Sequence, residues 1–531
     1  MNDSDRRAFM KRFAVAAAIT VPCAAESQSP PSIPTKDASG STFSIVEFGA
    51  IGDGKMLCTP AIQKAVEACA QRGGGRVIVP AGRFITGAIF LKSNIELEVS
   101  AGGTLALTTD IAGVPGIRGR WEGIDRTVYA SLINGENLEN VCITGRGTLD
   151  GQGEIWWREF RKVQELRKKY GLHDREPENP PGSPLKWARP RVINLYCCKN
   201  VAISGLRIVN SPSWTIHPVR CEGVCIEGVT ITAPSDAPNT DGIDPDSCRE
   251  VRISNCHISV GDDCIIIKSG YRYREDGMPS ENITITNCTF GTGHCGVGVG
   301  SETAGGVKNV AVSNCVCDGT DRGLRFKTAR GRGNAVENIR ASNIVMRNVG
   351  EALTVTMFYA GGDIHAAQPV DPYTPVFRKL QFSDIIVDGA KKVAVVEGLP
   401  EMPVEDLSLS NVIATGAARG IACTNAQGVR FDNVVLEAKE GTALEADTVR
   451  DLQIHGLSAR KSAAQQAIVG FENVEGALLQ SCTAAVNTGT FLQLKGTGNR
   501  DISMIANRLS QSRREVECIE GASESAIVKR A

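Results

Sequence analysis

A five-residue pattern recurs through most of this 531-residue chain and constrains its fold more than any other feature. Each copy alternates apolar with variable residues and ends in Asn, Gly or Asp. Alternation at period two predicts a half-buried strand, and the final residue predicts a turn. The clearest copies end at Gly145, Gly205, Gly228, Asn255, Asn287, Asn314, Asn343, Asp384, Asn411, Asn433 and Gly456. From Gly205 onward they lie 22 to 41 residues apart, a period that predicts stacked supersecondary units.

No helical pattern of useful length separates successive copies, which argues against alternating strand and helix. The architecture that remains is all-β: a single-stranded, right-handed parallel β-helix whose coils lie about 4.8 Å apart. Asn residues at equivalent turns should then stack as a hydrogen-bonded ladder. Cys256, Cys288 and Cys315 each follow such an Asn and should stack too. The 18 cysteines are therefore expected to be mainly buried free thiols, with one or two disulfides left open and little support for a zinc site.

The open ends of such a stack need covers, because exposed sheet edges invite aggregation. The segment TPAIQKAVEACAQRGGG predicts an N-terminal capping helix with Thr59 as N-cap, Pro60 at the first position and Ile62, Val66 and Cys69 buried. Residues 150–190 interrupt the repeat with an amphipathic basic helix and a Pro-rich loop. This insertion is expected to project over one end of a functional groove.

The N-terminus predicts export. Arg6 and Arg7 precede an apolar stretch at 13–21, a pattern that resembles a twin-arginine signal over residues 1–25. A linker at 26–41 and one catalytic domain at 42–531 follow. The apolar stretch is too short for a membrane anchor, whereas a lipid on Cys23 stays open. The mature protein is thus expected in the periplasm or secreted, outside the membrane and monomeric. The net charge of −1 argues against binding nucleic acid.

Five aspartates fall within residues 239–270, NTDGIDPDSCREVRISNCHISVGDDCIIIKSG. Acidic side chains beside an apolar strand are costly unless they have a function. Asp262 lies seven residues beyond its ladder Asn, and His294 lies seven beyond the next one, so the two should stack on adjacent coils. Asp241 from the preceding coil and Arg325 with Lys327 from the following one should complete a column across four coils.

Adjacent aspartates on one strand point to opposite faces, so Asp262 and Asp263 can share a site only if the chain bends at Gly261 or one of them faces a turn. Clustered carboxylates repel one another, so at least one should keep its proton near neutral pH. A protonated acid beside an ionised base is the minimum equipment for glycoside hydrolysis. The nearby cations would suit an anionic sugar.

Four motifs in this order, NTDG, GDD, GHC and RFK, resemble the signature of the polygalacturonase family of glycoside hydrolases, family 28. The resemblance extends over about residues 43–360 and implies a pectin lyase-like β-helix, a plant cell-wall polysaccharide rich in galacturonic acid as substrate, and neither cofactor nor metal. The motifs depart from the family pattern at Cys295, where Gly is usual, and at Phe326, where an aliphatic residue is commoner. Both changes are expected to alter a sugar subsite.

The resemblance also implies roles. Asp262 is similar to the family's general acid, and Asp241 and Asp263 are similar to the pair that activates water, which inverts the anomeric carbon. His294 is similar to the residue that supports the acid. The family's substrate-binding positions match Arg325, Lys327, Asn239 and His217 in this sequence.

Other interpretations remain open at this point. Asp244 and Asp246 are expected to be ordinary turn residues, and His217 could pack rather than line a groove. A calcium-dependent pectate lyase or a non-catalytic carbohydrate-binding β-helix would share the fold. Homogalacturonan, rhamnogalacturonan and substituted pectins all fit a site that binds carboxylates. The 150–190 insertion favours attack at chain ends over internal cutting.

Overall fold

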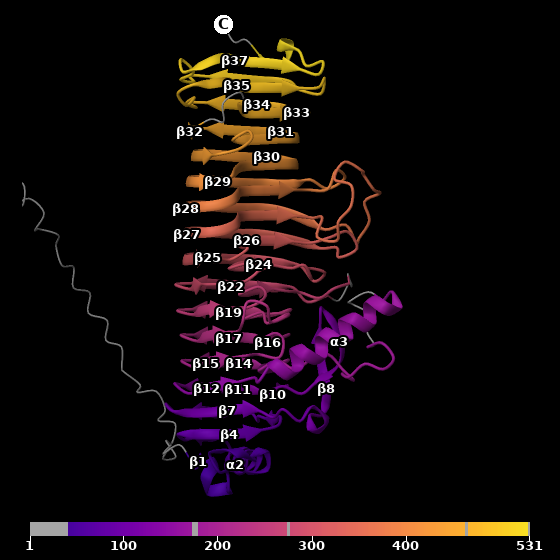
Figure 1. The fold of residues 1–531 in the computed structure, drawn as a ribbon, viewed down its shortest axis with the longest axis vertical. Coiled ribbons are helices and arrows are strands. Elements are labelled where there is room, and N and C mark those ends of the chain that lie inside the picture. The colour runs from indigo at the N-terminus through magenta and orange to yellow at the C-terminus, as the bar shows by residue number, and fades with distance from the viewer. Residues whose placement is uncertain (1–40, 173–178, 273–276, 462–465, 529–531) are drawn as a thin grey trace, which may run out of the picture. The chain divides into compact units, whose positions relative to one another are not determined.

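The computed structural model describes residues 41–172, 179–272, 277–461 and 466–528. Successive coils pair in parallel and build three sheets around one apolar core, which confirms the predicted right-handed parallel β-helix (Figure 1). The predicted signal peptide and, apart from residue 41, the predicted linker lie outside the described residues. Among the described residues, none of the helices has the length and apolar character needed to cross a membrane.

Three sheets run the length of the stack. The first contains β5 (Ile89–Phe90), β10 (Ile133–Glu136), β13 (Ile193–Tyr196), β16 (Ile216–Val219), β21 (Ile265–Ile267), β24 (Val297–Val299), β26 (Arg322–Lys327), β33 (Ala467–Glu472), β35 (Thr488–Lys495) and β37 (Ser512–Ile519). The second contains β1 (Thr42–Ser44), β3 (Gly75–Val79), β6 (Ile95–Val99), β11 (Glu139–Gly145), β14 (Lys199–Ser204), β17 (Glu222–Glu227), β19 (Arg249–Ser254), β22 (Ser280–Thr286), β34 (Glu475–Gln480) and β36 (Arg500–Ile505).

The third sheet contains β2 (Asp53–Leu57), β4 (Gly82–Thr86), β7 (Gly103–Leu107), β12 (Thr148–Asp150), β15 (Arg207–Val209), β18 (Thr230–Thr232), β20 (His257–Ser259), β23 (Thr289–Phe290) and β32 (Ser458–Lys461). Longer strands bend from one sheet into the next: β25 (Val307–Asp318), β27 (Ala335–Thr356), β28 (Val376–Glu397), β29 (Val404–Ala417), β30 (Arg419–Ala438) and β31 (Leu444–His455). Short 3₁₀ turns are η1 (Ile45–Phe48), η2 (Ile111–Gly113) and η3 (Glu524–Ala526).

The predicted asparagine ladder is present at the turn that ends each copy of the repeat. Asn287 donates to Asn255 at 3.3 Å, and Asn343 donates to Asn314 at 3.3 Å. These residues adopt the left-handed conformation, with φ between 55° and 58°. A second ladder, which the repeat did not predict, joins further turns: Asn140 to Asn94, Asn200 to Asn140, Asn309 to Asn282 and Asn338 to Asn309. Asn suits these turns for two reasons. Its side-chain amide forms a hydrogen bond with the neighbouring coil, and an Asn residue adopts positive φ more readily than most residues do.

All 17 cysteines among the described residues are free thiols, as predicted. Cys256, Cys288 and Cys315 stack as expected, because the residues that follow them pair in register on successive coils. Each thiol donates to the backbone carbonyl two residues before it, at 3.2 to 3.3 Å. They therefore act as small apolar residues of the core.

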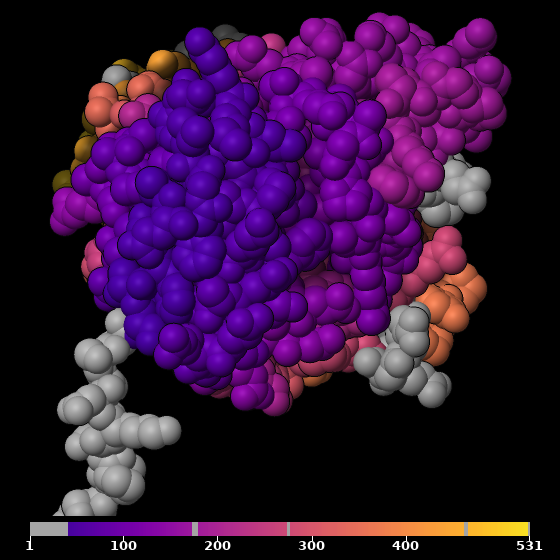
Figure 2. Space-filling view, turned by 90° about the horizontal axis from the view of Figure 1, so that it is seen from below, coloured from indigo at the N-terminus to yellow at the C-terminus, as the bar shows by residue number. Residues whose placement is uncertain are grey.

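The N-terminal end of the stack is covered by helix α2 (Thr59–Gln71), and Figure 2 shows N-terminal residues covering that end. The predicted stripe is buried, because Ile62, Val66 and Cys69 face the core. The predicted N-cap is wrong by one position. Cys58 is the N-cap, and the Thr59 hydroxyl instead accepts a hydrogen bond from the Gly87 amide at 2.6 Å, tying the helix to the first coils.

Two insertions project from the first coils. The antiparallel hairpin of β8 (Gly116–Trp121) and β9 (Ile124–Tyr129) precedes β10. Helix α3 (Glu154–Tyr170), within the predicted 150–190 insertion, precedes β13 and ends at Gly171, whose φ is 64°. Figure 1 shows that α3 and the long loop between β27 and β28 project from the same side of the stack. The hairpin of β8 and β9 and the helix α3 therefore each lead into a strand of the first sheet, β10 and β13 respectively.

The ladder predicts a measurable contribution to stability. Asn343→Ala removes one inter-coil hydrogen bond and leaves a residue with a side chain at positive φ, so we expect the unfolding free energy to fall by about 1–2 kcal/mol. Asn343→Gly removes the same hydrogen bond but fits the backbone, so its loss should be smaller. Urea denaturation of both variants tests this, and equal losses for Ala and Gly would contradict the backbone argument.

Candidate active site

Asp262 and Asp263 lie in the turn between β20 and β21 and not within a strand. Gly261 opens this turn, and a Cβ on it would lie 2.3 Å from the carbonyl oxygen of Ala237, so no larger residue fits. The Gly261 amide donates to the Thr240 hydroxyl at 3.0 Å. The bend that two adjacent aspartates require is therefore present. The Asp262 side chain is 18 % exposed, and that of Asp263 is 2 % exposed.

Neighbouring coils bring the other predicted groups to this turn. The His294 amide donates to the Asp262 carbonyl at 2.9 Å, and His294 Nδ1 lies 2.9 Å from Asp262 Oδ1. The predicted stacking of these two residues is thus confirmed. On the preceding coil, Ile243 pairs with Ile265, which places Asp241 opposite Asp263. The carboxylates from two coils and the imidazole from a third form one cluster.

The two predicted cations belong to β26, and their side chains reach back to Asp263. Lys327 Nζ lies 2.7 Å from Asp263 Oδ2, and Arg325 lies 3.7 Å from Asp263 Oδ1. The predicted column placed both cations directly above the turn that carries Asp262 and Asp263. In the structure Arg325 instead lies opposite Gly298, which is beyond that turn along the strand. Long side chains bridge this difference.

The two departures from the family pattern lie inside the coil. Cys295 is fully buried, and Phe326 is buried and packs on Phe382 with ring centroids 5.3 Å apart. Neither side chain reaches the surface, so an effect of these residues on a sugar subsite would act through the residues that pack on them.

Charge divides the carboxylates into two kinds. Burial alone would raise the pKa of Asp263, but Lys327 and Arg325 hold it well below the usual value, so this carboxylate is ionised at any working pH. Burial and the neighbouring acids raise the pKa of Asp241 well above its usual value. Burial also raises the pKa of Asp244 to about 7, against the opposing charge of Lys268. These raised pKa values favour a proton on Asp241 or Asp244, which agrees with the predicted protonation of one acid in the cluster.

Lys268 is a central residue that the sequence analysis missed. Its Nζ is buried and lies 3.6 Å from Asp241, 3.5 Å from Asp244 and 3.8 Å from Glu302. Burial lowers its pKa and the three carboxylates raise it, with a net rise, so it stays charged. A signal existed in the sequence: Ile265 and Ile267 face the core, so alternation places Lys268 on the opposite face of the sheet.

Asp244 and Asp246 are not the ordinary turn residues that the sequence favoured. Both are fully buried within the first sheet. Asp246 accepts a hydrogen bond from Arg120 at 2.8 Å, and this partner holds the Asp246 pKa well below its usual value despite burial. Because Arg120 lies on β8, this ion pair fastens the hairpin to the strand that follows Asp241.

The two remaining candidates have different environments. Asn239 is partly exposed, and its side-chain oxygen accepts a hydrogen bond from Arg189 at 2.6 Å. His217 is fully buried, with its ring 4.8 Å from that of Trp214, and burial lowers its pKa to about 3. Because its side chain has no exposed surface, the structure does not support the expected contact of His217 with substrate. His217 is a neutral packing residue beneath the site.

Asp262, Asp263 and His294 are close enough to share a cation, since one ligand atom from each lies within 4.8 Å of the others. The chemistry of this set suits calcium poorly, because calcium takes six to eight oxygen ligands and His294 offers nitrogen. Both Asp263 oxygens also face cationic side chains. The group is better equipped to exchange protons than to hold a metal.

The hydrogen bond between His294 and Asp262 predicts a pH effect. It raises the pKa of His294 above its usual value, so the pair keeps one shared proton until pH rises through that raised value. If this proton serves catalysis, His294→Gln should move the alkaline limb of the kcat profile to lower pH, since a lone carboxyl group loses its proton more readily. Steady-state kinetics between pH 3 and 9 test this, and an unmoved alkaline limb would contradict the shared proton.

Comparisons with known proteins agree with this geometry. A family model for glycosyl hydrolases family 28 matches residues 69–438. A probable polygalacturonase from Vitis vinifera is 36 % identical over 403 residues, covering 73 % of this chain and 77 % of that protein. An endo-polygalacturonase from Pectobacterium carotovorum subsp. carotovorum is 32 % identical over 67 % of this chain and 84 % of its own. The crystal structure of an exopolygalacturonase from Thermotoga maritima aligns with a TM-score of 0.61 and 32 % identity, over 78 % of this chain and 92 % of its own.

Proposed function

Because the chain belongs to glycosyl hydrolases family 28, we propose that it hydrolyses α-1,4 bonds between galacturonic acid residues in pectin-type polysaccharides. One observation carries the proposal. A partly exposed carboxyl group hydrogen-bonded to an imidazole, Asp262 with His294, adjoins a buried carboxylate, Asp263, that two cations keep ionised. One acid and one base at a single turn are what glycoside hydrolysis requires.

In the proposed reaction Asp262 gives its proton to the glycosidic oxygen as the bond to the anomeric carbon breaks. Asp263, which is ionised, takes a proton from a water molecule that Asp241 helps to hold, and the oxygen of this water bonds to the anomeric carbon from the opposite side. His294 shares the proton of Asp262 and orients it. Lys327 and Arg325 supply positive charge beside Asp263, where a substrate carboxylate would also be attracted.

We propose inversion of the anomeric carbon, although the spacing of the carboxylates alone would not select it. Oxygens of Asp262 and Asp263 lie within 4.8 Å of one another, nearer the roughly 5–5.5 Å of retaining enzymes than the 6.5–9.5 Å of inverting ones. Support for inversion comes from burial. The Asp263 side chain is almost fully enclosed and bound to Lys327, so it is poorly placed to attack a sugar directly but can polarise a water molecule.

Product analysis on polygalacturonate tests the function. With a chelator present, we expect new reducing ends without ultraviolet absorbance, and NMR should detect the β-anomer first. An absorbing double bond that depends on calcium would identify a lyase, and binding without products would identify a carbohydrate-binding protein. Products from rhamnogalacturonan or substituted pectins alone would place the enzyme on those polymers. The α-anomer as first product would contradict inversion.

Asp262→Asn provides the matched variant for this assay. It keeps the shape of the side chain and removes the transferable proton, so we expect kcat to fall by about 10²–10⁴-fold or more. Asp318→Asn is the control, because the Asp318 side chain is half exposed and pairs with Arg347 away from the site. Undiminished turnover by correctly folded Asp262→Asn would overturn the assignment.

We also propose that the enzyme reaches the periplasm or the medium through a twin-arginine route, supported by Arg6, Arg7 and the apolar stretch that follows. Because this route exports folded proteins, Arg6→Lys with Arg7→Lys should retain the protein in the cytoplasm in an active, folded form. Cell fractionation with an activity assay measures this. Normal export of the double variant would reject the proposed route.

A further inference from the structure

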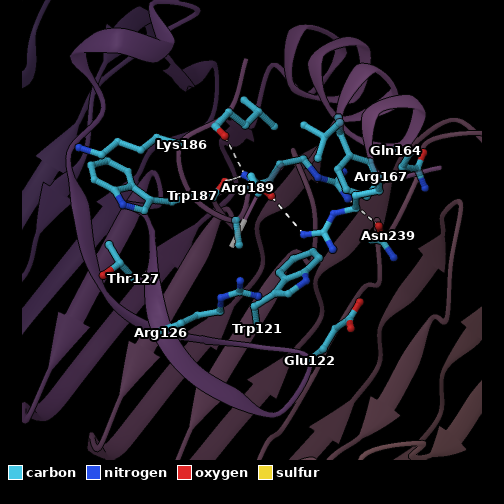
Figure 3. Close-up of a pocket in the computed structure, with 15 residues that line it drawn as sticks. Trp121, Glu122, Arg126, Thr127, Gln164, Arg167, Lys186, Trp187, Arg189 and Asn239 are labelled. Carbon is cyan, nitrogen blue, oxygen red and sulfur yellow. Dashed lines mark hydrogen bonds between the residues drawn. The ribbon is translucent and has the colours of Figure 1, made fainter. Parts of the chain in front are cut away.

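A pocket of about 560 Å³ lies between the hairpin β8–β9 and helix α3 (Figure 3). Its volume falls within the ~300–1,000 Å³ typical of small-ligand sites. Figure 3 shows Glu122 and Arg126 of the hairpin on one side and Gln164 and Arg167 of α3 on the other. Residues 185–189 form a further wall.

The lining of this pocket is cationic. Four cationic side chains contribute to it, Arg126, Arg167, Lys186 and Arg189, against the single carboxylate of Glu122. Arg189 is buried, and within the described part of the chain its Nε has no hydrogen-bond partner. A lining of this charge favours an anionic ligand, and guanidinium groups match the geometry of a carboxylate.

Aromatic rings supply flat walls in fixed positions. Trp121 stacks on Trp214 with ring centroids 4.8 Å apart. Trp187 packs edge-on against Tyr129 at 5.0 Å, and Lys186 Nζ lies 4.6 Å from the centre of the Trp187 ring. Rigid aromatic surfaces beside a few polar groups are the usual composition of a small-ligand site.

The pocket adjoins the catalytic cluster. Asn239 and Arg189 line it and are joined by a hydrogen bond of 2.6 Å, and Asn239 is two residues from Asp241. Burial lowers the pKa of Arg189 to about 9, while the charges of Asp241 and Asp262 act against this fall. Arg189 therefore lies within electrostatic reach of both carboxyl groups.

The hairpin that forms one wall is held by two later coils. The tip residue Gly123 accepts a hydrogen bond from the Tyr271 amide at 3.3 Å, and a Cβ on Gly123 would lie 2.4 Å from that nitrogen. Arg120 pairs with Asp246, as described above. These contacts attach the hairpin to the coils beside the proposed catalytic residues, so its position as a wall of the pocket is fixed.

We propose that this pocket receives the terminal uronic acid residue of the substrate, so that the enzyme removes sugars from a chain end. The inference rests on the proposed function and names the specificity of the same site. Arg126 and Lys186 contact the terminal carboxylate, and Trp187 contacts the sugar ring. Asn239 connects the pocket to the catalytic cluster. The bond that is cut therefore lies between the terminal sugar residues at the pocket and the rest of the polysaccharide.

Two measurements on the unmodified enzyme test the mode of attack. Oligogalacturonides labelled at the reducing end should release one small product from the first turnovers onward, and the label shows which end is attacked. The viscosity of polygalacturonate should fall slowly relative to the appearance of reducing ends. A mixture of internal fragments with rapid loss of viscosity would overturn the pocket proposal while leaving the hydrolase intact.

Variants test whether the pocket recognises the terminal carboxylate. Arg126→Gln and Lys186→Gln should each raise KM by about tenfold to a hundredfold, the usual cost of losing a charged hydrogen bond. An oligomer whose terminal carboxylate has been reduced to the alcohol should suffer a similar loss with the unmodified enzyme, but little further loss with either variant. This non-additivity identifies a direct partnership, because a general structural defect would affect both substrates.

Arg158→Gln is the control, because Arg158 lies on α3, which forms one side of the pocket, but its side chain is 65 % exposed and outside the pocket lining. We expect its KM to be unchanged. Lys186 is exposed, so its variant should fold even if Arg126→Gln does not. Equal losses on both substrates would overturn the pocket proposal. Absence of any uronide hydrolysis by the unmodified enzyme would instead overturn the proposed function.

Discussion

Hydrogen bonds between equivalent strands of successive coils fix every side chain in the site. Because parallel strands lie about 4.8 Å apart, groups separated by 20 to 60 residues in the chain become neighbours across one or two coils. Asp241, Asp262 and His294 come from three coils and meet without any local sequence contact between them. The repeat therefore does more than build a core. It sets the distance between Asp262 and His294, and a turn at Gly261 directs two consecutive carboxylates into the same space.

The buried carboxylates of the site have little contact with water. Each of them forms an ion pair with a cationic side chain from another coil or from the hairpin. Lys327 neutralises Asp263, Lys268 serves Asp241, Asp244 and Glu302, and Arg120 serves Asp246. Removing one member of such a group would leave an uncompensated buried charge, which costs several kcal/mol. The cations therefore stabilise the first sheet and also influence the ionisation of the carboxylates within it.

The repeat and its equal offsets were sufficient to predict the β-helix and the contact between Asp262 and His294, since both depend on register alone. Lys268 was missed because its three partners lie on other coils, although strand alternation placed it on the correct face. The burial of His217 could not be predicted, because Trp214 and the hairpin that cover this region lie outside the repeat. The walls of the pocket beside Asn239 come from two insertions that obey no common register. The sequence indicated one of them, the 150–190 insertion over one end of a groove, but had no signal for the hairpin of β8 and β9.

The stacked thiols also have a chemical consequence. Cys256, Cys288 and Cys315 lie on adjacent coils, and a coil spacing of about 4.8 Å falls within the Cα separations that disulfides span. An oxidant that reaches these sulfurs during folding can therefore join neighbouring coils through a disulfide. Burial removes them from attack once the coils have formed. With the export route proposed above, folding precedes exposure to an oxidising compartment, so the order of these two events protects the thiols.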